Sequence, residues 1–158
     1  MKKIIPFSVA LLLFIACSNN GNNSKGVSGN DIPPKKTQVD SLMEQVMDGH
    51  NAGMAKMSKI RKMQKEVARV LDSMAALPVK AKQAAVPYKI QLDSLAAGLR
   101  YAEVAMDKWM EEFNMDSAVN NMGQRIKYLG DEKWKVGKVK EAILSSLQKA
   151  DSLLKAKL

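Results

Sequence analysis

Apolar side chains recur at alternating intervals of three and four through most of this 158-residue chain. An α-helix has 3.6 residues per turn, so such positions share one face, and a chain with several of these faces must bury them against one another. Eleven methionines and only 5% aromatic residues also favour helices. The clearest run is Leu92, Leu95, Leu99, Ala102, Met106, Trp109 and Phe113.

Prolines divide this pattern into three helical segments. The first should begin near Gln38, where Ser41 and Glu44 have the spacing of a capping box, and end before Pro78. The second should cover residues 88–113, and the third should begin near residue 119 and run close to the C-terminus. Gly49 and Gly53 weaken the first segment, but their spacing of four would let another helix approach closely. We expect one continuous first helix and an all-α fold, an elongated antiparallel three-helix bundle with coiled-coil-like seams.

The N-terminal residues have the composition of a lipoprotein leader. Lys2 and Lys3 precede a short apolar run, and Ala16-Cys17 resembles the cleavage and acylation site of a bacterial lipobox. Cys17 is the only cysteine, so lipidation explains it better than a disulfide does. The sequence therefore predicts a signal peptide (residues 1–16), a lipidated Cys17 with a flexible linker (17–37) and a helical domain (38–158). Ser18 follows the cysteine where an aspartate would indicate inner-membrane retention in Gram-negative lipoproteins, so this resemblance implies the outer membrane, with the domain facing the periplasm.

The charge balance indicates which kinds of partner the protein can bind. The formal net charge is +9, but an exported protein has little opportunity to bind nucleic acid. An envelope protein or an anionic envelope polymer is the expected partner. The lipid anchor additionally attaches the protein to the membrane.

The only histidine lies within a methionine stripe. If the first two helices are antiparallel around the turn at Pro78, paired residue numbers sum to roughly 164, which places His50 level with Met110 and Phe113. The sequence predicts a group of side chains at this end, here called the His–Met cluster: Met47, His50, Met54, Met57, Met106, Trp109, Met110 and Phe113.

Two motifs in this cluster resemble a family of small bacterial lipoproteins of unknown function, often labelled viral A-type inclusion protein. The first is Met47-x-x-His50 followed by Met54-x-x-Met57, and the second is Met106-x-x-Trp109-Met110-x-x-Phe113. The family tends to have acidic residues after the histidine, where this chain has Asn51 and Ala52. The resemblance implies a helical, lipid-anchored domain without a known reaction.

Two functional hypotheses follow. The leading one is a structural or protein-interaction module of the cell envelope without a cofactor, in which Met47, Met57, Met106 and Phe113 are core residues. The alternative is soft-metal binding, of Cu(I) or Ag(I), through His50, Met54, Trp109 and Met110, a residue set similar to that of periplasmic copper carriers. Haem ligation by His50 and a facing methionine is a weaker option, since Cys-x-x-Cys-His is missing. One histidine and one cysteine leave little for nucleophilic catalysis, so an enzyme is not expected.

Overall fold

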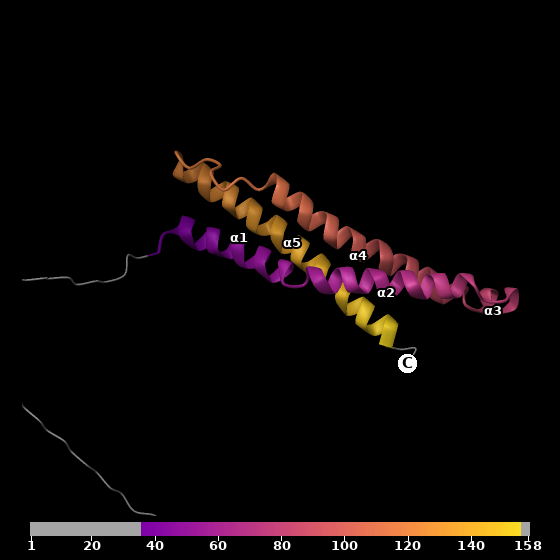
Figure 1. Cartoon of the computed structure of the whole chain (residues 1–158). Coiled ribbons are helices and arrows are strands. Elements are labelled where there is room, and N and C mark those ends of the chain that lie inside the picture. Colours follow the sequence, from indigo (N-terminus) through magenta and orange to yellow (C-terminus); the bar gives the residue numbers. More distant parts are fainter. Residues whose placement is uncertain (1–35, 156–158) are drawn as a thin grey trace, which may run out of the picture. The chain divides into compact units, whose positions relative to one another are not determined.

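The computed structural model describes residues 36–155, and within this range all regular structure is helical (Figure 1). The helices are α1 (Gln38–Met54), α2 (Met57–Ala75), α3 (Val79–Ala84), α4 (Val86–Glu112) and α5 (Met122–Lys155). The chain divides into two units, Met1–Pro34 and Lys35–Leu158, and the described residues belong to the second. The all-α prediction is confirmed, whereas the predicted signal peptide and Cys17, with nearly all of the predicted linker, lie outside the described residues.

Helix α1 begins one turn earlier than the predicted capping box. The Thr37 hydroxyl accepts a hydrogen bond from the Asp40 backbone N–H at 3.1 Å, and the Asp40 carboxylate accepts one from the Thr37 backbone N–H at 3.0 Å. The Thr37 hydroxyl also donates to the Asp40 carboxylate at 2.6 Å, and this side-chain hydrogen bond, followed by the one from the Thr37 backbone N–H, lowers the pKa of Asp40. Ser41 cannot be the cap because its own N–H already donates to the Thr37 carbonyl within the first turn.

The predicted continuous first helix is wrong, because the chain turns at residues 55–56 and separates α1 from α2. Two residues before the turn, Gly53 leaves no room for a Cβ atom beside the Met106 methyl carbon. The Lys56 N–H donates to the Gly53 carbonyl at 2.9 Å, a tighter i→i+3 turn than an α-helix makes. This turn changes the direction of the helix axis, so that α1 packs mainly on α5 and α2 mainly on α4 (Figure 1).

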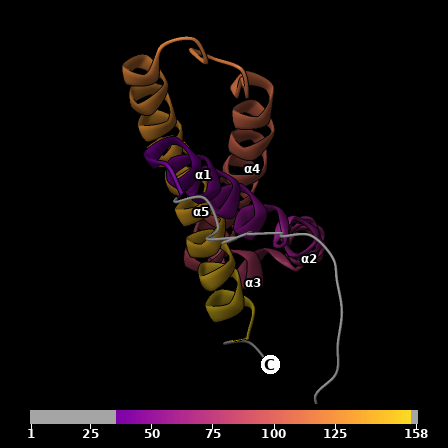
Figure 2. The same ribbon diagram turned by 90° about the vertical axis from the view of Figure 1, so that its left-hand side faces the viewer.

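The contacts between helices give their directions. On α2, the Gln64 amide donates to the Leu99 carbonyl at 3.4 Å and to the Glu103 carboxylate at 2.8 Å on α4, in agreement with the predicted antiparallel register. Helix α1 runs parallel to α5, because Gly49 lies against Val136 and Gly53 against Ile143. Helix α4 runs antiparallel to α5, and their ends are joined by the connection at residues 113–121 (Figure 2).

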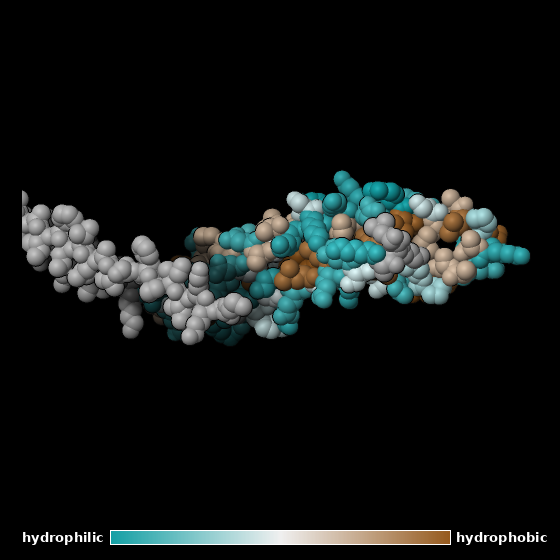
Figure 3. Space-filling view, turned by 90° about the horizontal axis from the view of Figure 1, so that it is seen from below, coloured by the Kyte–Doolittle hydropathy of each residue, from teal (hydrophilic) through white to brown (hydrophobic). Residues whose placement is uncertain are grey.

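The apolar stripes meet in one core. Its fully buried side chains come from α1, α2, α4 and α5: Val46, Ile60, Val67, Leu92, Leu99, Ala102, Met106, Val136, Ile143 and Ala150. The face of the molecule seen in Figure 3 is largely hydrophilic, and hydrophobic residues are exposed on it in separate patches. Within residues 36–155, no helix combines the length and the apolarity that a membrane crossing requires.

Helix α5 differs from the predicted third helix at its start. The predicted helix begins near residue 119, but α5 begins only at Met122, and the apolar side chains of Val119 and Met122 are both more than half exposed. The Asn121 side chain accepts a hydrogen bond from the Gln124 N–H at 3.0 Å, the role of an N-cap, and fixes the start there. From Met122 the helix continues without a break to Lys155.

The glycines of α5 provide a stability prediction. A Cβ added at Gly137 would have no atom within 4 Å, so alanine there introduces no clash and removes the backbone entropy that glycine loses in a helix. We expect Gly137→Ala to raise the free energy of unfolding by about 0.5–1 kcal/mol, measured by denaturant unfolding followed by circular dichroism. A lower stability would show that α5 is packed more closely at this position than described.

Candidate functional site

The His50 ring on α1 lies against two residues of α4. Its Nε2 atom is 3.4 Å from the Sδ atom of Met110, and its ring centroid is 5.6 Å from that of Trp109. These residues are 59 and 60 positions apart in the chain. The predicted meeting of the only imidazole with the Trp109-Met110 pair is therefore found in the structure.

The other ring nitrogen of His50 has its own partner. Nδ1 lies 3.0 Å from the side-chain oxygen Oδ1 of Asn51, which can only accept a hydrogen bond. The donor and acceptor roles of the two ring nitrogens depend on the tautomer of the imidazole. In the neutral tautomer with its proton on Nδ1, the hydrogen bond to Asn51 orients the ring, and Nε2 presents its lone pair toward the Met110 sulfur and can act as a ligand.

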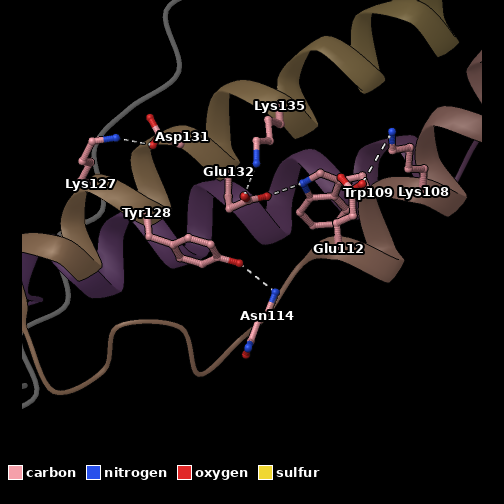
Figure 4. A network of polar contacts seen from close by, with 9 residues as sticks. All are labelled: Lys108, Trp109, Glu112, Asn114, Lys127, Tyr128, Asp131, Glu132 and Lys135. Atoms are coloured by element: carbon pink, nitrogen blue, oxygen red, sulfur yellow. Dashed lines mark hydrogen bonds and ion pairs between the residues drawn. The ribbon is translucent and has the colours of Figure 1, made fainter.

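Trp109 begins a series of aromatic rings that leads from α4 to α5. Its ring stacks on Phe113 with centroids 4.9 Å apart, and Phe113 in turn lies 6.2 Å from Tyr128 of α5. The Tyr128 hydroxyl accepts a hydrogen bond from the Asn114 N–H at 2.8 Å, just after the end of α4 (Figure 4). These contacts hold this end of α4 on α5 and fix the ring that faces His50.

A buried carboxylate supports Trp109 from the other side. Glu132 is only 3% exposed, and one of its oxygens accepts a hydrogen bond from the Trp109 indole N–H at 2.9 Å (Figure 4). Its other oxygen accepts one from the Lys135 ammonium at 2.8 Å. This hydrogen bond raises the pKa of Lys135, against the opposing effect of desolvation.

Sequence reasoning missed Glu132, although a signal was present. Glu132 lies three residues after Leu129 and four before Val136, so it occupies the buried stripe of α5. A carboxylate at such a position needs a hydrogen-bond donor in the core. The nearby indole of Trp109 is the donor.

Arg125 is a second buried polar residue that sequence reasoning missed. It is 7% exposed, and its guanidinium donates to the carbonyls of Ser117 and Met115, each at 2.6 Å. The connection between α4 and α5 thus closes around a side chain that satisfies its backbone carbonyls. It includes Ala118, at φ 58°.

The structure separates the predicted His–Met cluster into layers. Met57 and Met106 are buried core residues, and Met47 and Phe113 are half-buried. Met54 and Met110 are 39% and 38% exposed, with Met110 alone of the two in a described contact with His50. Among residues 36–155 no group of three or more His, Cys, Asp or Glu side chains is placed to hold a metal.

No protein family, curated protein or solved structure matches the chain.

Proposed function

We propose that this protein is a lipid-anchored module of the bacterial envelope that binds another envelope protein. The proposed anchor is Cys17, in a lipobox-like sequence, and the proposed location is the periplasmic side of the outer membrane. The sequence motifs around His50 and Trp109 support kinship with the small lipoproteins they resemble. The chain runs up through α1 and α2, down through α4 and up again through α5. These directions support a folded part that is an antiparallel three-helix bundle with coiled-coil-like seams.

An exposed tryptophan carries this proposal. Trp134 on α5 is 66% exposed, whereas Trp109 is buried. Gly130 and Gly137 lie one turn to either side of it with open space where a Cβ would be, and Leu42 of α1 and Lys133 complete a shallow groove. Water contact with so large an apolar ring is unfavourable, and tryptophan is enriched among the residues that contribute most to protein interfaces.

The composition of this groove favours a protein as the occupant. The glycines leave room beside the indole for a partner's apolar side chain, and Lys133 and Lys138 border it with positive charge. Lys138 forms an exposed ion pair with Glu141 at 2.9 Å, so it can exchange this partner for a carboxylate of another protein at little cost.

Site-specific photo-cross-linking tests this interface. A benzophenone amino acid at position 134 of the full-length chain, activated in intact cells, should yield a discrete adduct with one envelope protein. Position 101 provides a matched control, because Tyr101 is aromatic and 65% exposed on α4. The proposal is wrong if position 134 gives no protein adduct, gives only adducts with polymer, or gives the same adducts as position 101.

A further inference from the structure

We propose that His50 Nε2 and Met110 Sδ are ligands of a soft monovalent metal ion, Cu(I) or Ag(I), with the Trp109 indole as its aromatic neighbour. This site lies between α1 and α4 and is independent of the protein-binding groove around Trp134 on α5. Its ligand set is narrower than the one predicted from sequence, since it requires only the two donor atoms that the structure brings together.

The two donor atoms are already at a separation that suits one metal ion. They lie 3.4 Å apart. Zinc lies about 2.0 Å from an imidazole nitrogen and about 2.3 Å from a cysteine sulfur, and an ion with bond lengths of this size can bind both atoms at an angle of roughly 105°. Binding therefore needs little movement of either side chain.

The hydrogen bond to Asn51 explains why a cation is favoured at this position. In the neutral tautomer that donates from Nδ1 to Asn51 Oδ1, the Nε2 lone pair is directed toward a thioether, which has no proton to donate. Two lone pairs face each other in this tautomer. A metal ion between them accepts both, and Asn51 acts as the outer partner that fixes the ring orientation.

The donor types determine the class of metal. A thioether sulfur is a soft, uncharged ligand that selects Cu(I) over the hard cations, and imidazole binds copper readily. The partial exposure of both His50 and Met110 leaves one side of the site open for an additional ligand. Met54, one helical turn after His50 and 39% exposed, is available on the same helix for that position.

The buried carboxylate strengthens the aromatic part of the site. The Trp109 ring lies 5.6 Å from the His50 ring, close enough for its face to attract a cation bound at Nε2. Its N–H donates to the Glu132 carboxylate at 2.9 Å, which shifts electron density into the indole ring. Glu132 is thus a positioning residue that both orients Trp109 and makes it a better partner for a cation.

Anaerobic titration with Cu(I) against a coloured competing chelator tests the proposal. The full-length chain in detergent should be used with Cys17→Ser, because Cys17 has a free thiol in any chain that is not acylated and that thiol would also bind Cu(I). Trp134→Phe should be added so that fluorescence reports on Trp109. We expect one Cu(I) per chain and quenching of Trp109 on binding. Met110→Leu, which conserves volume but removes the sulfur, should weaken binding at least about tenfold.

Met115→Leu is the matched control, because Met115 is exposed at 57% in the following connection, away from the described contacts of His50. It should bind Cu(I) with unchanged affinity. His50→Gln should lose binding as Met110→Leu does. The proposal is overturned if the parent chain takes up no Cu(I), if uptake leaves Trp109 fluorescence unchanged, or if Met110→Leu and Met115→Leu bind equally well. These outcomes are separate from the cross-linking at Trp134.

Discussion

Replacing Gly49 by leucine should lower the free energy of unfolding by about 2–3 kcal/mol, despite the higher helix propensity of leucine. A Cβ at Gly49 would lie 2.9 Å from the Cγ1 atom of Val136, which is fully buried. Valine is branched at Cβ and has little freedom to turn away, so α1 would have to move off α5. Denaturant unfolding followed by circular dichroism at 222 nm measures the loss.

Gly130→Leu is the matched control for this substitution. Gly130 is also inside a helix, but a Cβ there would have no atom within 4 Å. Stability should stay the same or rise by up to about 1 kcal/mol, because only the backbone term changes. Equal losses at both positions would mean that α1 and α5 are not in close contact at Gly49.

Replacing Glu132 by alanine should cost about 2–4 kcal/mol of unfolding free energy. The substitution leaves the buried Trp109 N–H without its acceptor and removes the carboxylate that Lys135 contacts. Glu132→Gln keeps an oxygen for the indole and should lose at most half as much. Thermal and denaturant unfolding measure both variants, and the near-ultraviolet circular dichroism of Trp109 should weaken in the alanine variant.

Glu141→Ala is the control that separates the effect of burial on stability from the effect of losing an ion pair. Glu141 lies on the same helix and forms an ion pair at the same i,i+3 spacing, with Lys138 at 2.9 Å, but both side chains are exposed. Its removal should change stability by no more than about 0.5 kcal/mol. If Glu132→Ala were as mild, the carboxylate would not be holding Trp109.

The register of the helices could be predicted from sequence because it depends only on periodicity and on one turn. Antiparallel pairing around Pro78 placed His50 beside Met110, and the 3.5 Å contact of Arg61 with Glu103 shows the same register farther along. Both of these contacts follow from the rise per residue of an α-helix, which does not depend on the side chains.

The break between α1 and α2 could not be predicted in the same way, and the partners of the buried polar residues could not be predicted either. Apolar spacing continues through residues 55–56, so the stripe gives no sign of the turn that directs α1 toward α5. Apolar spacing does not mark Glu132 and Arg125 as buried, because both side chains are charged, although both lie on the buried face of α5. Their burial depends on partners that tertiary packing supplies, an indole N–H in one case and two loop carbonyls in the other.

The meeting of His50 with Met110 is tested most directly by nuclear Overhauser effects in the folded protein. His50 is the only histidine, so its ring protons are assigned without ambiguity, and the methionine methyl groups can be labelled selectively. A separation of 3.4 Å between Nε2 and Sδ predicts a strong cross-peak from the His50 ring to the Met110 methyl group. A folded protein whose His50 ring shows cross-peaks only to residues of α1 would contradict the account.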